Sequence, residues 1–512
     1  MRAKTEPAQT GGAAWGKTSA TSQRRDVPKL AYALVLASFV FWTLYADWSQ
    51  YNLDQFGDML ENHAWGIRWQ LGNPHHPPLF GWITAAWFLV FPRTDFAYHA
   101  LAAANIALSL LVMLRIAKRY LDASQLVLSV AVALGLPLLG FMSITYNANS
   151  AMTPFWALTF FAYLRALERG GPGDAILLGV FAALAMLAKY HSAVLLLALV
   201  LHSIADRETR LLWRTRLPLI ALSAFALVLL PHVVWLVENQ FAPFVFAVAE
   251  QGDRTLANIA YREVEFGTAQ ILYASPGLAV LGLYRRPRDG CPLFDVWQFM
   301  RLTETQSGRA LLAAGLLPVP LTMILGLLLW VPLTSNWSVP FFIFTPILLI
   351  LLLPKELADR RSRTAPVFAA VFIAVLLALT PVIRHAIIAQ GRNHADLPVA
   401  EIAAKADALW REHTDAPLGY VGGDTILSHG MAFYSAFRPQ AIRGTDFEAR
   451  SWIEPDALEL SGSMVLCLTL ACVEDTAQRQ AGAIQKQLKV AAPAGSATDT
   501  FDVTVLLRMP EE

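Results

Sequence analysis

The sequence predicts a polytopic α-helical membrane protein with about eleven transmembrane helices and a small α/β domain outside the membrane at its C-terminal end. Of the 512 residues, 55% are hydrophobic and only 15% are charged, whereas globular proteins carry about 25% charged residues. The apolar residues also gather in runs of roughly 17 to 25, the length that crosses a bilayer. A soluble protein of this size could not hide so much apolar surface, so most of the chain is expected in lipid.

Nine of the apolar runs are clear, and one longer block is interrupted by a polar segment. The nine runs lie near 29–47, 97–117, 125–142, 151–168, 217–237, 266–284, 309–331, 337–354 and 365–388. The block 174–204 is interrupted at Lys189. Because a charge at mid-bilayer is costly, we expect two short helices there that meet at Lys189. Eleven crossings would leave the two ends of the chain on opposite sides of the membrane.

The distribution of lysine and arginine predicts a cytoplasmic N-terminus, because cytoplasmic segments carry an excess of these residues. With this orientation the cytoplasmic segments hold 24 of them, and the outer loops before the tail hold only five. Those five are Arg68, Arg93, Lys189, Arg254 and Arg262. We therefore expect a cytoplasmic segment at 1–28, a transmembrane domain at 29–388 with a first outer loop at 48–96, and an outer domain at 389–512. The charged run 1–28 leads into a full span without the features of a cleavable signal.

The tail after residue 388 has the composition of a small α/β domain, since charges and turn residues return there. Short apolar runs at Leu418–Val421, Met464–Leu470 and Val503–Leu507 are expected as strands, and 399–412 and 475–488 as helices. A disulfide between Cys467 and Cys472 requires a turn between them, because an extended strand would hold them too far apart.

Charge and cysteine content exclude other classes of protein. A net charge of +1 without a basic tail argues against nucleic acid as a partner. Three cysteines are too few for a disulfide scaffold or a multi-cysteine zinc site.

The first outer loop concentrates groups that could perform chemistry. Asp54, Asp58 and Glu61 recur at spacings of four and three, which predicts three carboxylates on one helix face. Such a face indicates either a site near the membrane surface or a solvated acidic helix. After it come His75 and His76, followed by two prolines that should end one helix and start another. The aromatic helix that follows is expected at headgroup level, with Trp82, Trp87, Phe88 and Phe91.

Other polar clusters also fall on the outer side. They comprise Tyr146, Asn147 and Asn149 between two spans, Lys189 and Tyr190 at the helix break, and Arg254 and Arg262 in a later loop. Each alone is explained by helix capping or by a loop. Together they place most of the unusual polar chemistry on one face, where ammonium and guanidinium groups suit a lipid phosphate.

These motifs, in this order, resemble the C-type (GT-C) membrane glycosyltransferases. The similarity is to the bacterial branch of the dolichyl-phosphate-mannose protein mannosyltransferases, which includes aminoarabinose and galacturonic acid transferases acting on lipid A or lipopolysaccharide core. It rests on the acidic first loop with His76-Pro77-Pro78-Leu79, on 146–157, on 187–190, on 231–235, and on Gly422-Gly423-Asp424 with Ala432-Phe433-Tyr434 in the tail.

The resemblance implies an enzyme that moves a sugar from a polyprenyl-phosphate carrier to an acceptor at the periplasmic face of a bacterial inner membrane. Lipid A, lipopolysaccharide core or another envelope glycan or lipid would be the acceptor. The reaction would invert the anomeric centre and need no metal or other cofactor. The tail 389–512 would then be periplasmic.

The resemblance also implies roles for the outer polar residues. The family's Asp-Glu motif best matches Asp54-Gln55, where the second acid is absent. Asp54 and Asp58 are therefore both candidates for the catalytic carboxylate, with Asp54 favoured for its distance to Trp65-Gly66, and Asp58 or Glu61 can substitute for the missing acid. The candidate substrate-binding residues are His75, His76, Tyr146, Asn147, Asn149, Lys189, Tyr190, Arg254 and Arg262. Arg254, Arg262 or Lys189 would stabilise the departing phosphate, and His76 stands where the family often has lysine.

A transporter or lipid flippase is the alternative interpretation. It would need ionisable residues inside the spans or broken helices around a central cavity. The break at Lys189 is the main feature that favours it, whereas few other ionisable residues lie within the predicted spans.

Overall fold

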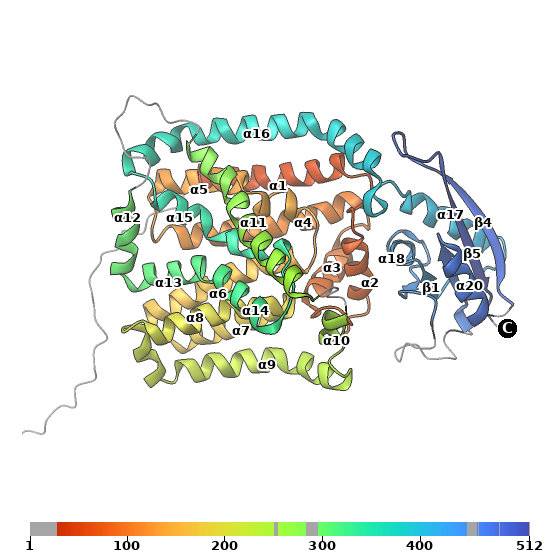
Figure 1. The fold of residues 1–512 in the computed structure, drawn as a ribbon, viewed down its shortest axis with the longest axis horizontal. Coiled ribbons are helices and arrows are strands. Elements are labelled where there is room, and N and C mark those ends of the chain that lie inside the picture. The colour runs from red at the N-terminus through yellow and green to blue at the C-terminus, as the bar shows by residue number, and fades with distance from the viewer. Residues whose placement is uncertain are drawn as a thin grey trace, which may run out of the picture.

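The computed structural model describes residues 28–249, 254–282, 295–447, 458, 460–480 and 482–510. Its helices form an elongated body, and the tail lies at one end of this body (Figure 1). Nearly all of the predicted segment 1–28 lies outside the described residues.

Twelve packed helices, most of them long, make up the described part of the body. They are α1 (Lys29–Ser49), α4 (Asp95–Ala117), α5 (Ala123–Gly135), α6 (Ala148–Arg169), α7 (Pro172–Ala188), α8 (Ala193–Ala205), α9 (Leu217–Glu238), α11 (Leu256–Gly282), α13 (Gln306–Leu316), α14 (Pro318–Leu329), α15 (Thr345–Leu351) and α16 (Lys355–Gln390). Helix α1 packs against α4 and α16, while α7 packs between α6 and α9. The short helices α10 (Ala242–Ala249) and α12 (Val296–Met300) connect longer ones.

The predicted number of eleven spans is not confirmed by helix length and composition. Among the described residues, four helices are long and apolar enough to cross a membrane: α1, α4, α9 and α16. A fifth is obtained if α13 and α14, which are bent by 45° at Leu317, are counted as one span. The coarser prediction of a mostly helical membrane protein is confirmed.

Two predicted spans are more irregular than expected, and a third breaks where predicted. The run 125–142 is helical only to Gly135, because Pro137 follows and cannot continue the backbone bonding. The run 337–354 begins as a 3-10 helix, Ser335–Ile343, and becomes α-helical only in α15. The block 174–204 divides at Lys189 into α7 and α8, joined by the 3-10 turn Tyr190–Ser192.

The first outer loop forms two short helices, α2 (Asp58–Gly66) and α3 (Leu79–Val90), which lie between the helix body and the tail (Figure 1). As predicted, α3 starts directly after Pro78. The helices cross closely at Gly66, where a Cβ atom would lie 2.1 Å from the Gly81 carbonyl oxygen. The prediction that Asp54 shares a helix face with Asp58 and Glu61 is wrong. Gly57, at φ 80°, takes a left-handed conformation, and α2 starts only after it, so Asp54 lies outside the helix.

The tail is an α/β domain with a five-stranded sheet in the order β2-β1-β3-β5-β4. The strands are β1 (Tyr420–Gly423), β2 (Gln440–Ala441), β3 (Ser463–Cys467), β4 (Ile484–Ala491) and β5 (Thr500–Arg508), and the helices are α17 (Val399–Arg411), α18 (Thr425–Tyr434) and α20 (Leu470–Arg479). Strand β1 is parallel to β2 and β3, whereas β5 is antiparallel to β3 and β4. The predicted helix 475–488 is partly wrong, because pairing of β4 with β5 overrides the local preference.

Helix α18 is the part of the tail that packs onto α2. Phe433 of α18 lies edge-on to His63 of α2, with ring centroids 5.0 Å apart, and to Phe88 of α3 at 5.4 Å. A Cβ atom at Gly430 would collide with Val399 of α17 at 2.2 Å. The buried apolar residues of α2, α17 and α18 form one core, so the first outer loop and the tail are packed as a unit.

Cys467 and Cys472 form a disulfide with Cα atoms 5.5 Å apart. The turn that the sequence required is provided by the start of α20, since Cys467 ends β3 and Cys472 lies in the first turn of that helix.

We expect the disulfide to stabilise the tail by about 2 kcal/mol, the loop-closure entropy of so short a loop. A Cys467→Ser/Cys472→Ser variant should unfold at a correspondingly lower temperature, and a reductant should bring the native chain to the same value without affecting the variant. Thiol titration of the denatured chain should find one of the three cysteines before reduction and three after. Three free thiols in protein made in an oxidising compartment would contradict the prediction.

Candidate active site

Asp58 is held at the start of α2 by the beginning of helix α6. Its Oδ2 accepts a hydrogen bond from Asn147 Nδ2 at 2.8 Å. Asn147 is the N-cap of α6, and its Oδ1 accepts the backbone N–H groups of Asn149 and Ser150 at 3.0 and 3.1 Å. The Asp58 side chain is partly exposed. One carboxylate oxygen is therefore fixed, and the group as a whole stays partly accessible.

Lys189 joins this group from the break between α7 and α8. Its Nζ donates a hydrogen bond to Asn149 Oδ1 and lies 5.7 Å from the ring centre of Trp337. The Asp58 carboxylate is near enough to stabilise the ammonium charge. A carboxylate and an ammonium thus face one small region, bridged by two asparagines. We call Asp58, Asn147, Asn149 and Lys189 the acid–lysine cluster.

Aromatic side chains next to Lys189 in the chain connect the α7–α8 break to α9 and α10. Tyr190 shares a hydrogen bond of 2.8 Å with His232 Nε2 and stacks on Phe244 with ring centroids 4.8 Å apart. His232 in turn bonds through Nδ1 to the Leu71 carbonyl oxygen at 2.6 Å. This chain of contacts ties α9 to the first outer loop and gives the site a wall of rings.

Glu61 and His75 form a second polar pair in the same loop. Glu61 Oε1 lies 3.3 Å from His75 Nδ1, and the His75 ring stacks on Phe246 with centroids 3.7 Å apart. Arg443 of the tail donates to His75 Nε2 at 3.2 Å. A proton on Nδ1 satisfies both partners, because Nε2 then accepts from Arg443 and Nδ1 donates to Glu61.

His76, which stands where the family often has lysine, lies in surroundings that disfavour a charged ring. Burial, and secondarily the positive charge of Lys189, lower the pKa of His76 to about 3. Its backbone N–H donates to Asn73 Oδ1 at 2.8 Å, which shapes the turn before α3.

Asp54 supports the loop rather than facing the site. Its side chain is only 4% exposed, and its two oxygens accept backbone N–H groups of Phe56, Asp58 and Met59 at 2.7, 3.2 and 2.8 Å. Burial, and secondarily the Asp58 charge, raise the pKa of Asp54 to about 6. Asp54 thus caps the start of α2, because Gly57 at the N-cap position has no side chain that could accept these bonds.

Three other predicted site residues lie apart from the acid–lysine cluster. The Tyr146 side chain is completely buried, and it is the backbone carbonyl of Tyr146 that accepts a bond from Asn62. Arg262 is exposed on α11 and pairs with Glu265 at 2.7 Å. Arg254 donates to the Val248 carbonyl at 2.8 Å. Within the described ranges, no hydrogen bond or ion pair joins either arginine to the cluster, so neither forms part of it.

Sequence reasoning missed Arg443, Phe246 and His232 as members of the site. No local signal links Arg443 or Phe246 to the first loop, because long-range packing alone brings them there. His232 belongs to a motif that the resemblance included, so it could have been selected. In the described part of the chain, no group of three or more His, Cys, Asp or Glu side chains could hold a metal ion, and metal independence stays a prediction.

Comparisons with known proteins agree with this architecture. Residues 75–235 match the family model of dolichyl-phosphate-mannose-protein mannosyltransferase. The structure of ArnT from Cupriavidus metallidurans in the apo state matches with a TM-score of 0.62, and that of ArnT bound to undecaprenyl phosphate with 0.58. In each case the sequence identity is 14%, and the match covers 93% of this chain and 97% of the ArnT chain. Among curated proteins, none matches the sequence.

The fold match extends over both the helix body and the tail, while the family match includes the segment from His75 to Trp235 that builds most of the site. Together they confirm the predicted resemblance and enzyme class: residues 75–235 match a glycosyltransferase family model, and the chain has the fold of ArnT, a C-type membrane glycosyltransferase.

Proposed function

We propose that the chain transfers a sugar from a polyprenyl-phosphate carrier to an envelope glycan or lipid, with Asp58 as the catalytic carboxylate. The observation that carries the proposal is the acid–lysine cluster, in which Asp58 and Lys189 face the same region from α2 and from the α7–α8 break. The undecaprenyl phosphate bound to the ArnT structure of the same fold supports the choice of donor. Lipid A or lipopolysaccharide core are acceptors that we propose on the resemblance alone.

Asp58 is preferred over Asp54 because of what each carboxylate already binds. Both oxygens of Asp54 are occupied by backbone N–H groups in a buried turn. Asp58 has one oxygen fixed by Asn147 and is partly exposed. A group that takes a proton from a substrate must lie within hydrogen-bond reach of it, and of these two carboxylates the partly exposed Asp58 is the better placed.

Lys189 is suited to stabilise the departing phosphate. Transfer breaks the bond between the anomeric carbon and the phosphate oxygen, and the bond electrons go to that oxygen. An ammonium group prearranged beside it stabilises the charge that develops. The acceptor oxygen forms the new bond from the opposite face while its proton passes to Asp58, so the anomeric configuration inverts.

The orientation that we propose places this site at the periplasmic surface of a bacterial inner membrane. The site lies at the end of the helix body that carries the tail (Figure 1), and the excess of lysine and arginine is at the other end of the predicted spans. The disulfide between Cys467 and Cys472 supports an oxidising compartment for the tail.

Replacing Asp58 by Asn should lower sugar transfer by roughly 10²- to 10⁴-fold, the usual contribution of a positioned general base, with little change in the unfolding temperature. Asp54→Asn is the matched variant. It should lower the unfolding temperature, while the transfer rate per folded molecule should change little. Mass spectrometry of envelope lipids from cells with and without the protein gives the transferred sugar and the acceptor, and the same mass difference then measures each variant. Full transfer by the Asp58→Asn variant would show that Asp58 is not the catalytic base.

Replacing Lys189 by Ala should weaken binding of a polyprenyl-phosphate donor about 10- to 100-fold, since a hydrogen bond to a charged group contributes about 1.5–3 kcal/mol. Titration of the purified chain with undecaprenyl phosphate measures the affinity. Arg262→Ala is the control, because Arg262 is paired with Glu265 outside the cluster. Equal losses of donor affinity in Lys189→Ala and Arg262→Ala would contradict the assignment of Lys189 to the donor phosphate.

Asp54 should make stability depend on pH. Its pKa is about 6 in the folded chain and about 3.9 when unfolded, so the folded state binds the proton more tightly and is stabilised as the pH falls through 6. Between pH 7 and pH 5 the native chain should gain about 1 kcal/mol relative to Asp54→Asn. Thermal unfolding of both proteins in neutral detergent at the two pH values measures this difference. A difference that does not change with pH would show that Asp54 titrates alike in both states.

A further inference from the structure

An apolar cavity lies among helices α6, α7, α8 and α9, apart from the acid–lysine cluster. Its volume is about 560 Å³, within the range of about 300–1,000 Å³ that small-molecule sites occupy. Its lining comes from these four helices and from the 3-10 helix η4 (Thr209–Arg214), which joins α8 to α9. None of the four residues of the acid–lysine cluster is among the described residues that line it.

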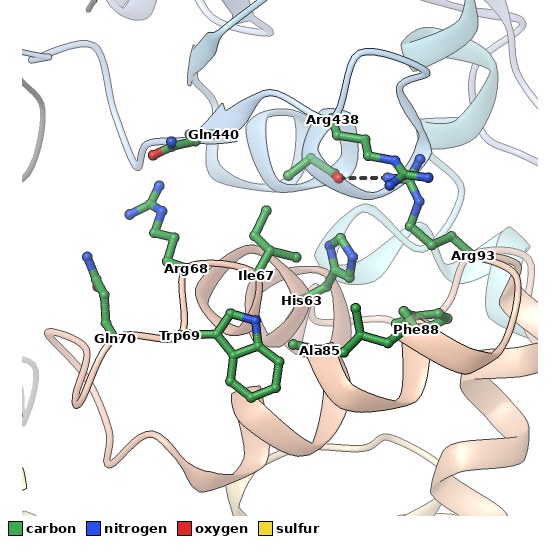
Figure 2. A pocket seen from close by; sticks show the side chains of 12 residues that line it. His63, Ile67, Arg68, Trp69, Gln70, Ala85, Phe88, Arg93, Arg438 and Gln440 are labelled. Carbon is green, nitrogen blue, oxygen red and sulfur yellow. Dashed lines mark hydrogen bonds between the residues drawn. The ribbon is translucent and has the colours of Figure 1, made fainter.

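The apolar cavity begins at the end of the helix body away from the tail. The other end of α9 carries His232, which bonds to Leu71 of the first outer loop, and α10 lies beside that loop (Figure 1). The cavity is lined instead by the start of α9, from Leu217 on. At 1.5 Å per residue, the two ends of this 22-residue helix lie about 33 Å apart. Figure 2 shows a different cavity, between the first outer loop and the tail, with His63 and Arg438 in its lining.

Close helix packing closes the inner side of the apolar cavity, whereas its outer side is open. A Cβ atom at Gly179 of α7 would lie 2.1 Å from the Ala221 carbonyl oxygen of α9, so these two helices touch there. Leu219 and Leu222 of α9 also line the cavity, and they are 66% and 62% exposed. Helix α9 is long and apolar enough to cross a membrane, so these exposed side chains face lipid. A lipid chain can therefore reach the cavity from the side.

The polar side chains that line the apolar cavity are already bonded within the protein. Tyr163 shares a hydrogen bond of 2.7 Å with His202 Nδ1. Trp213 Nε1 donates to Ser203 Oγ at 3.1 Å, and Ser203 in turn donates to the Val200 carbonyl oxygen at 2.7 Å. Most of the other described lining residues are alanine or leucine. A polar ligand would have to compete with these bonds, whereas an apolar chain leaves no polar group unpaired.

Two arginines lie at the end of the apolar cavity that η4 forms. Arg214 is the last residue of η4 and Arg216 is the N-cap of α9, and both side chains are exposed. Thr215, between them, lines the cavity. Its hydroxyl donates to the Leu212 carbonyl oxygen at 2.6 Å and accepts the Leu217 backbone N–H at 3.2 Å. These bonds fix the turn, so the backbone that carries both arginines is held beside the cavity.

Trp213 places this end of the apolar cavity at the head-group level of the membrane. Its side chain lines the cavity and is 50% exposed, and tryptophan is enriched at membrane–water interfaces. Arginines at this level attract anionic lipids. A negatively charged head group would complement the two guanidinium groups, and an acyl chain of the same molecule would complement the apolar lining. In the orientation that we propose, this is the cytoplasmic surface.

We infer that the apolar cavity binds an acyl chain of an anionic phospholipid, whose head-group phosphate pairs with Arg214 and Arg216. Guanidinium groups bind phosphate oxygens in pairs of parallel hydrogen bonds, and both arginines flank a residue of the lining. The bound lipid would connect α8 and α9 at the end of the body away from the acid–lysine cluster. This inference does not depend on the proposed reaction, and the lipid is distinct from the proposed sugar donor.

The test titrates the full chain in neutral detergent with phosphatidylglycerol and counts the bound lipid by native mass spectrometry. Arg214→Gln/Arg216→Gln should weaken binding about 25-fold, from about 1 kcal/mol for each arginine near an anionic lipid surface. Ala182→Leu adds carbon atoms to the lining and should weaken binding about tenfold, since overfilling a packed site costs about 1–3 kcal/mol. The matched control, Arg115→Gln/Lys118→Gln, removes two charges at the end of α4 away from the tail, outside the described lining. It should bind as the native chain does.

Other lipids separate this site from its alternatives. Phosphatidylcholine should bind more weakly than phosphatidylglycerol, and undecaprenyl phosphate should not displace phosphatidylglycerol. Equal affinity for phosphatidylcholine would overturn the role of the arginines, and displacement by undecaprenyl phosphate would assign the cavity to the sugar carrier instead. A loss in the control variant as large as in Arg214→Gln/Arg216→Gln would overturn the site itself. Because both of these arginines are exposed, their replacement leaves the fold intact, and the test stays decisive if thermal unfolding shows that Ala182→Leu is destabilised.

Discussion

The hydrogen bond between Asn147 and Asp58 is the contact on which the rest of the candidate site depends. Asn147 Oδ1 is committed to two backbone N–H groups as the cap of α6, so its Nδ2 can only point outward, where Asp58 accepts it. A helix start buried in the body thereby fixes the direction of a carboxylate in a loop. Because Asn149, two residues on, holds Lys189, a single turn of α6 positions both charges.

The tail contributes to the site from a distance that the sequence does not reveal. Arg443 reaches His75, which is paired with Glu61, and α18 packs against α2. A short helix such as α2 has little stability of its own, so its conformation depends on packing between the body and the tail. The sugar-transfer chemistry that we propose therefore requires that packing.

The sequence predicted the architecture better than the site. Apolar runs and the Lys189 break have local causes, and the break appeared where predicted. Hydrophobicity could not separate a straight span from the bent pair α13 and α14 or from the 3-10 segment before α15, since these differ in packing and not in composition. The tail strand β4 was mistaken for a helix because only its pairing with β5 makes it a strand.

The same difference between local pattern and packing explains why the placement of the acidic residues was partly wrong. Spacing alone put Asp54 on a helix with Asp58 and Glu61. In the structure the helix starts only after Gly57, and the Asp54 side chain turns inward to cap it. Spacing could identify the loop as unusual, but only the backbone could show which carboxylate is occupied.

Helix α2 keeps opposite charges apart at the end of the helix body that carries the tail. At about 100° per residue, Asp58 and Glu61 share one side of this helix, and Ile67, which lines a cavity together with Arg93 and Arg438, lies on the opposite side. His63 lies toward that side too and is buried. Had Arg93 and Arg438 faced the acids, carboxylate and guanidinium groups would pair and Asp58 would be less available to a substrate. The intervening helix keeps these groups apart, so one short element, held by the tail, leaves a carboxylate beside Lys189.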